Sequence, residues 1–82
     1  MEAHDYRMEA LLYYAKSAST RQKSLVFRRF PVAAEAIRFA VEELEPKVFN
    51  SCSLEVNDLQ YFGREIRPLY DSGEFPLKRR AT

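Results

Sequence analysis

The amino-acid sequence predicts a small two-layer α+β domain in which helices cover a three-stranded mixed sheet. Residues 31–45 carry apolar side chains at helical spacing between two prolines, and residues 24–30 and 52–62 alternate as strands do. The length of 82 residues suits a single domain. The predicted order is β-α-β-β-α, preceded by an N-terminal helix. It divides the chain into a helical arm and linker (1–22), a core domain (23–77) and a disordered basic tail (78–82).

Residues 2–17 predict the N-terminal helix, because they lack Gly and Pro and are rich in Ala, Leu, Met, Glu and Lys. Their apolar side chains fall on two adjacent faces: Met8, Leu11, Leu12 and Ala15 on one, and Tyr6, Ala10, Tyr13 and Tyr14 on the other. A helix that is apolar on two sides needs a covering surface. The sequence therefore predicts a docked helix, with a free arm as the alternative. Residues 17–23 predict a polar linker.

A strand followed directly by a helix occupies residues 24–45. Within the strand, Leu25, Phe27 and Arg29 share one face and Val26, Arg28 and Phe30 share the other. Pro31 suits the first helical turn, and Pro46 cannot continue the helix. The predicted core stripe contains Ala33, Ile37, Ala40, Val41 and Leu44. Val32, Ala36 and Phe39 form a second apolar row, which predicts a contact with the N-terminal helix or an interface.

A hairpin and a short helix follow. Cys52, Leu54 and Val56 alternate with polar residues, and a two-residue turn at Asn57-Asp58 would pair Val56 with Leu59 and Leu54 with Tyr61. If the first two strands are adjacent, they are parallel with a right-handed crossover. Residues 47–50 predict a connection, and residues 64–71 predict a short helix despite Pro68. Residues 75–77 are expected to pack against the domain.

Charge and cysteine content narrow the class of protein. The 13 Lys and Arg residues against 12 Asp and Glu give a net charge of +1, whereas a dedicated duplex-DNA binder is usually strongly basic. Cys52 is the only cysteine, which excludes an internal disulfide and indicates a reducing compartment. No apolar run approaches the roughly 18 residues of a membrane span. We expect a soluble, cytoplasmic protein.

The sequence carries no recognisable set of catalytic or metal-binding residues. His4 is the only histidine, and Cys52 alternates in phase with Leu54, as a core residue does. Only Gly63 and Gly73 are glycines, so a glycine-rich phosphate loop cannot form, and no Cys/His metal spacing exists. These observations predict a non-enzymatic protein without a metal or cofactor.

Two functional hypotheses remain. The first is binding to another protein or to a second copy of the chain, through Leu11, Tyr13, Tyr14, Val32 and Phe39. The second is single-stranded nucleic-acid binding on a sheet face without helices. That face would hold Val26, Arg28, Phe30, Glu55 and Phe62, with help from Arg29 and the tail residues Lys78, Arg79 and Arg80. The sequence identifies neither the ligand nor the biological process.

Overall fold

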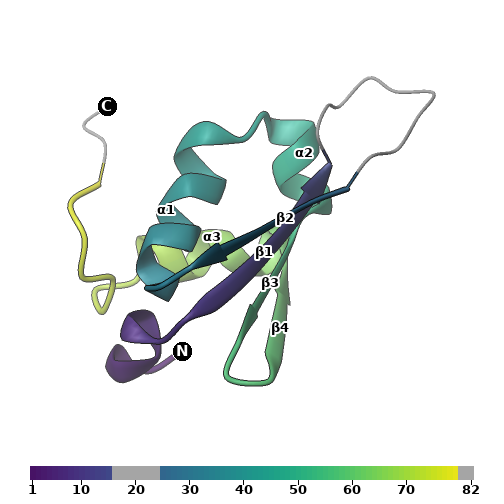
Figure 1. Ribbon diagram of the computed structural model, residues 1–82. Coiled ribbons are helices and arrows are strands. Elements are labelled where there is room, and N and C mark those ends of the chain that lie inside the picture. The colour runs from purple at the N-terminus through teal and green to yellow at the C-terminus, as the bar shows by residue number, and fades with distance from the viewer. Residues whose placement is uncertain (16–24, 80–82) are drawn as a thin grey trace.

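Four antiparallel strands form one open sheet in the order β2-β1-β3-β4 (Figure 1). The computed structural model describes residues 1–15 and 25–79. Along the chain, the elements are a 3-10 helix η1 (Ala3–Arg7), β1 (Ala10–Ala15), β2 (Leu25–Phe30), α1 (Ala33–Glu43), α2 (Pro46–Ser51), β3 (Ser53–Val56), β4 (Leu59–Phe62) and α3 (Gly63–Asp71).

The sheet corrects the predicted topology. The segment expected to be an N-terminal helix instead contains β1, which lies between β2 and β3 and pairs antiparallel with both. β2 and β3 are therefore not neighbours, and the expected parallel crossover does not exist. The sheet is four-stranded and antiparallel, not three-stranded and mixed, and residues 10–15 belong to the core sheet, not to a separate arm. The predicted linker at 17–23 lies outside the described residues.

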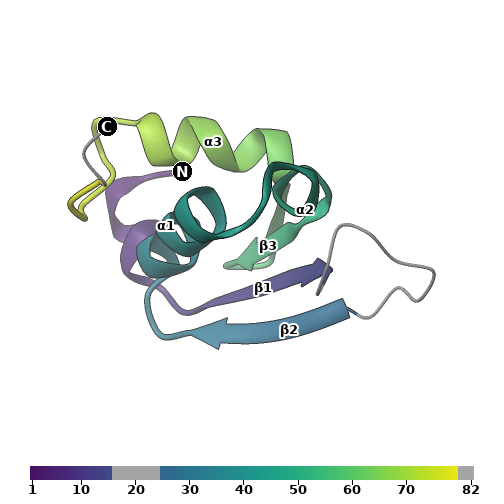
Figure 2. The ribbon, with the colours of Figure 1, turned by 90° about the horizontal axis from the view of Figure 1, so that it is seen from above.

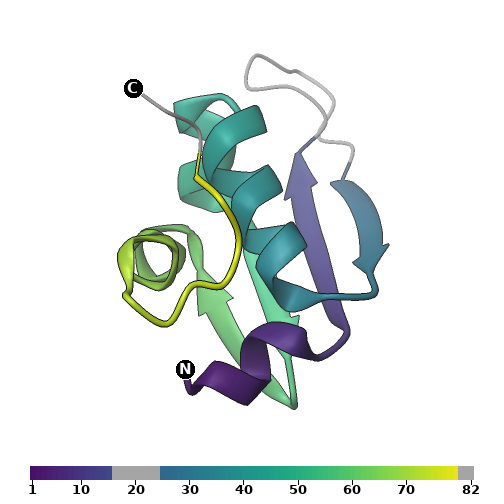
Figure 3. The same cartoon turned by 90° about the vertical axis from the view of Figure 1, so that its left-hand side faces the viewer.

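The three α-helices lie on one side of the sheet (Figures 2 and 3). The buried core between the two layers contains Leu12, Leu54 and Val56 from the strands and Ala36, Ile37, Ala40 and Ile66 from the helices. Helices segregated to one face of an antiparallel sheet define an α+β architecture. The predicted class and its two layers are therefore confirmed, although the sheet differs.

The central helix is confirmed with shorter bounds. α1 begins two residues after Pro31, with Val32 in an extended N-cap conformation. Ala33, Ile37 and Ala40 are fully buried as predicted, and so is Ala36, which the sequence placed in the second row. α1 ends at Glu43, before Pro46. Pro46 is the first residue of α2, where its missing N–H costs nothing. The connection predicted at 47–50 is wrong for this reason.

The hairpin has the predicted register. Val56 pairs with Leu59 and Leu54 pairs with Tyr61. Asn57 and Asp58 both have positive φ, of 52° and 66°. Two left-handed residues make the type I′ turn whose twist matches that of the flanking strands. The short turn therefore fixes the hairpin.

The C-terminal segment packs against α3, the predicted short helix. α3 includes Pro68 and buries Ile66, Leu69 and Tyr70. Phe75 is also buried, as expected, with its ring 5.1 Å from that of Tyr70 and 6.0 Å from that of Tyr6. Arg79 donates hydrogen bonds to the carbonyls of Tyr70 (2.7 Å) and Ser72 (2.6 Å). The prediction of a disordered tail is therefore wrong for Arg79, and residues 80–82 lie outside the described part.

Candidate functional site

One face of the sheet carries none of the three α-helices, and we call it the open face (Figures 2 and 3). The strand registers place ten residues on it: Leu11, Tyr13, Ala15, Leu25, Phe27, Arg29, Ser53, Glu55, Gln60 and Phe62. Several are large and apolar yet exposed. Leu25 is 74% exposed, Phe27 53% and Phe62 54%. A sheet face normally buries such side chains, so the open face is the first candidate interaction surface.

The aromatic residues of the open face lie in one row across the strands. Tyr13 pairs with Phe27 on one side and with Ser53 on the other, and Ser53 pairs with Phe62. The rings of Tyr13 and Phe27 are in contact, with centroids 5.1 Å apart. Ser53 is a small residue in the middle of this row. The row therefore presents aromatic side chains from β2, β1 and β4 in one line.

The next row carries the charges of the open face. Arg29 pairs with Leu11, which pairs with Glu55, so the two charged residues flank β1. Arg29 also contacts Glu9, with 3.7 Å between Nε and Oε2, and both side chains are more than half exposed. An ion pair this exposed contributes little, at most about 1 kcal/mol. The open face thus combines apolar area with one cation and one anion.

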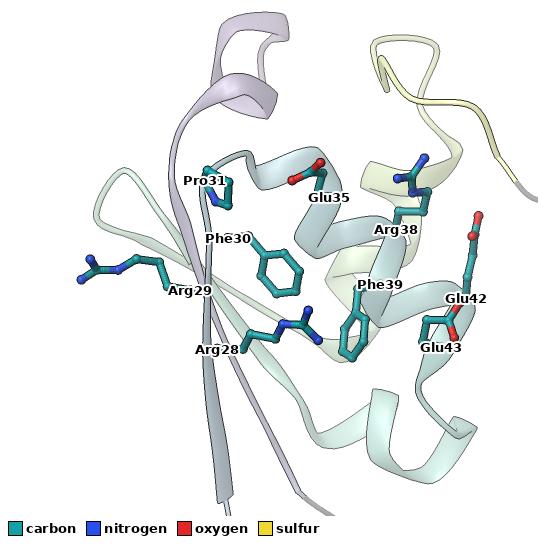
Figure 4. Close-up of a pocket in the computed structure, with 9 residues that line it drawn as sticks. All are labelled: Arg28, Arg29, Phe30, Pro31, Glu35, Arg38, Phe39, Glu42 and Glu43. Carbon is teal, nitrogen blue, oxygen red and sulfur yellow. The ribbon is translucent and has the colours of Figure 1, made fainter.

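The second candidate is a pocket of about 420 Å³ between β2 and α1, which we call the β2–α1 pocket (Figure 4). Arg28, Arg29, Phe30 and Pro31 line it from the strand side. Glu35, Arg38, Phe39, Glu42 and Glu43 line it from α1, where their spacing puts them along one side of the helix. In Figure 4, Arg28 and Phe30 point toward α1, whereas Arg29 points away from it.

Arg28 packs against two aromatic rings in this pocket. Its guanidinium carbon is 4.9 Å from the ring centroid of Phe30 and 4.8 Å from that of Phe39. Cation–π contacts at these distances are attractive and restrict the side chain. No other described residue forms a hydrogen bond or ion pair with Arg28. Within the described part of the chain, its N–H groups are therefore available to bind an anion.

The residues predicted to bind protein are divided between the two sides of the sheet. Leu11 and Tyr13 lie on the open face, whereas Tyr14 contacts Phe39 of α1, with ring centroids 5.6 Å apart. Val32 is half-buried against the core. The expected contact between the N-terminal segment and the second apolar row therefore exists within one chain, but a strand makes it, not a helix.

The residues predicted to bind nucleic acid do not share a face either. Arg28 and Phe30 lie on the helix-covered side, while Phe62 and Arg29 lie on the open face. The apolar residues that share the open face with Phe62 are Leu11, Tyr13, Ala15, Leu25 and Phe27. The period of β2 was visible in the sequence. Which face of β2 meets the helices was not visible, because the pairing of β2 with β1, and of β1 with β3, determines it. Arg79 is held beside α3 and Arg80 lies outside the described residues.

The single histidine and cysteine occupy unrelated positions. His4 is exposed. Its Nε2 lies 3.2 Å from Oδ1 of Asp5, and its Nδ1 lies 3.6 Å from Oε2 of Glu2. Cys52 is fully buried, and desolvation raises the pKa of its thiol to about 11. Within residues 1–15 and 25–79, no cluster of three or more His, Cys, Asp or Glu could hold a metal ion. In the same ranges, no helix is long and apolar enough to span a membrane.

Comparisons with models of protein families, with curated proteins and with solved structures found no match to this chain.

Proposed function

We propose that this chain is a small non-enzymatic cytoplasmic protein that acts through protein–protein interaction, with its open face binding a second copy. The supporting observation is the aromatic row of Tyr13, Phe27 and Phe62 on a face that no helix covers. A phenylalanine buries about 150–250 Å² when covered, so the half-exposed Phe27 and Phe62 each leave roughly 100 Å² uncovered. Contiguous apolar area of this kind marks interaction surfaces.

Charge complementarity supports a second copy as the partner. In a symmetric dimer both subunits contribute the same surface, so that face must complement itself. A two-fold axis that runs along β1 brings β2 of one subunit over β3 of the other. Arg29 then lies opposite the partner subunit's Glu55, and Leu11 lies opposite the partner subunit's Leu11. Two sheets packed in this way form an aligned β-sandwich.

Single-stranded nucleic acid is the second candidate, because an aromatic row can stack bases. The charges of the open face do not support it. Arg29 is accompanied by Glu9 at 3.7 Å and by Glu55 in the same row. Proteins that bind single strands without sequence preference combine stacking rings with a positively charged groove. The open face has no such excess, so we favour the protein partner.

Sedimentation velocity over a range of concentrations tests the dimer. We expect Arg29→Glu and Glu55→Arg to shift the wild-type dimer toward monomer, since each puts like charges opposite one another. The double variant exchanges the two charges and should restore the dimer. Phe27→Ser should weaken association independently of charge. Glu74→Gln is the matched control and should leave association unchanged, because Glu74 is an exposed carboxylate outside the open face.

The same samples decide between the two candidates. A wild-type chain that stays monomeric at every concentration, or a double variant no more associated than the single variants, would overturn the dimer. Titration with a fluorescent single-stranded oligouridine tests the alternative. Binding that weakens steeply with salt and is lost in Phe27→Ser would support nucleic acid instead.

A further inference from the structure

β2 offers a second kind of binding surface, which is independent of the proposed dimer. It is an edge strand that pairs only with β1 among the described residues. The outer edge of such a strand presents a row of backbone N–H and C=O groups. Extended peptides bind edges of this kind by adding one more strand, and pockets beside the edge then select their side chains. The β2–α1 pocket lies beside β2 on the helix side of the sheet.

The alternation of β2 determines which side chain of an added strand would enter the pocket. Arg28 and Phe30 point from β2 toward α1 (Figure 4). A residue directly opposite Arg28 on an added strand would have its Cβ about 4.5–5.5 Å away on the same side of the sheet. A carboxylate there can accept two parallel hydrogen bonds from the guanidinium group. Residues two positions to either side would lie opposite Val26 and Phe30.

Contacts with two rings restrict the exposed side chain of Arg28 before any ligand arrives. Its guanidinium group lies over the rings of Phe30 and Phe39, at 4.9 Å and 4.8 Å from their centroids, and the two rings contact each other with centroids 5.7 Å apart. Ordering a flexible side chain is part of the cost of binding, and this contact lowers that cost in advance. The planar guanidinium group stacks on rings better than a lysine ammonium group does. The geometry therefore favours an acidic side chain as the ligand of Arg28.

The charges around β2 argue against other occupants of its edge. Arg28 and Arg29 are consecutive, so pairing β2 with its copy in a symmetric antiparallel ladder brings arginines near one another, which is destabilising. A polyanion such as nucleic acid would meet the carboxylates of Glu35, Glu42 and Glu43 on the opposite wall of the pocket, where Arg38 supplies a single positive charge. A peptide that brings a single carboxylate to Arg28 avoids the first conflict and limits the second to one negative charge.

We propose that the β2 edge and the β2–α1 pocket bind an extended acidic peptide segment of a partner protein. An Asp or Glu of that segment pairs with Arg28, and apolar residues two positions to either side lie opposite Val26 and Phe30. The backbone of the segment pairs with the outer edge of β2. The proposal concerns the helix side and the edge of the sheet, so it stands or falls separately from association through the open face.

Selection from a phage-displayed library of random peptides on the immobilised full chain tests the predicted pattern. We expect enriched sequences with an acidic residue flanked two positions away by apolar residues. The best peptide is then synthesised together with a matched peptide in which the acidic residue is replaced by its amide. Fluorescence anisotropy should show the acidic peptide binding about tenfold more tightly, as loss of a charge-assisted hydrogen bond would predict.

Protein variants locate the interaction. Arg28→Gln should bind both peptides with the weaker affinity of the amide peptide, and Arg28→Lys should recover only part of the difference. Arg67→Gln is the matched control, because Arg67 also stacks on a ring, that of Tyr70 at 5.6 Å, but lies outside the pocket. It should bind like the wild type. Circular dichroism establishes that each variant is folded.

Three results would overturn the proposal. They are a library that yields no acidic pattern, equal affinity for the acidic and amide peptides, or a folded Arg28→Gln variant that keeps the full difference between them. Amide hydrogen exchange adds a readout of position. Binding should slow exchange of β2 amides, and protection confined to β4, the opposite edge, would also contradict the proposal.

Discussion

The hydroxyl of Tyr6 donates a hydrogen bond to the backbone carbonyl of Leu69 at 2.9 Å, joining residues 63 positions apart in the sequence. Leu69 is one of the last residues of α3, where carbonyl groups have no partner within the helix. Arg79 donates to the next carbonyl, that of Tyr70. Residues near both ends of the described chain therefore donate hydrogen bonds to the last carbonyl groups of α3. Arg79 also places a positive charge at the C-terminal end of the helix, where the helix dipole favours one.

Removing this hydroxyl tests how much the contact contributes. Tyr6 is fully buried, so Tyr6→Phe keeps the ring but leaves the Leu69 carbonyl without its partner. We expect the free energy of unfolding to fall by about 1–3 kcal/mol, the cost of an unsatisfied buried group. Urea unfolding measures the change. Tyr13→Phe, at a half-buried residue of the open face, is the control and should stay within about 0.5 kcal/mol of wild type. Equal stability of the two variants would contradict this role.

Local patterns predicted the hairpin and α1, whereas β1 was not predictable from its own residues. Both sides of β1 are apolar: Ala10 and Leu12 are buried beneath the helices, and Leu11 and Tyr13 lie on the open face. Alternation between apolar and polar residues is therefore absent. Ala and Leu also favour a helix intrinsically. Pairing with β2 and β3 on both edges overrides that preference, and a single segment contains no information about such pairing.

The same missing strand explains the error in the candidate site. The alternation of β2 correctly grouped Leu25 with Phe27 and Arg29, and Arg28 with Phe30. Which group faces the helices depends on the register of β2 with β1, and of β1 with β3. With β1 read as a helix, the two faces of β2 were exchanged. The β2–α1 pocket has no sequence signature, because Arg28, Phe30 and Phe39 come into contact only in the folded chain.

The buried thiol of Cys52 makes stability depend on pH. Burial raises its pKa from 9.0 to about 11. Between these values the unfolded thiol loses its proton while the folded thiol keeps it, so ionisation stabilises the unfolded chain and stability falls as pH rises. We expect wild type to lose up to about 2–3 kcal/mol relative to Cys52→Ala over this interval. Urea unfolding of both proteins at matched pH measures the difference, which removes the contribution of the other titrating groups. A constant difference would contradict the prediction.

Gly63 and Gly73 form a matched pair for the last prediction. A Cβ at Gly63 would lie 2.3 Å from the carbonyl oxygen of Phe49 and 2.7 Å from that of Asn50, whereas a Cβ at Gly73 would meet nothing within 4 Å. The Phe49 and Asn50 oxygens belong to the backbone of α2, so α2 and α3 must separate to admit the methyl group of Gly63→Ala.

We expect Gly63→Ala to lower the free energy of unfolding by about 1–3 kcal/mol, the usual cost of overpacking. Neither glycine has positive φ. Gly73→Ala should therefore be neutral or stabilise by up to about 1 kcal/mol, because alanine restricts the unfolded chain. Thermal and urea unfolding of the two variants measure both changes. A Gly63→Ala variant as stable as Gly73→Ala would mean that α2 does not pack against the start of α3 this closely.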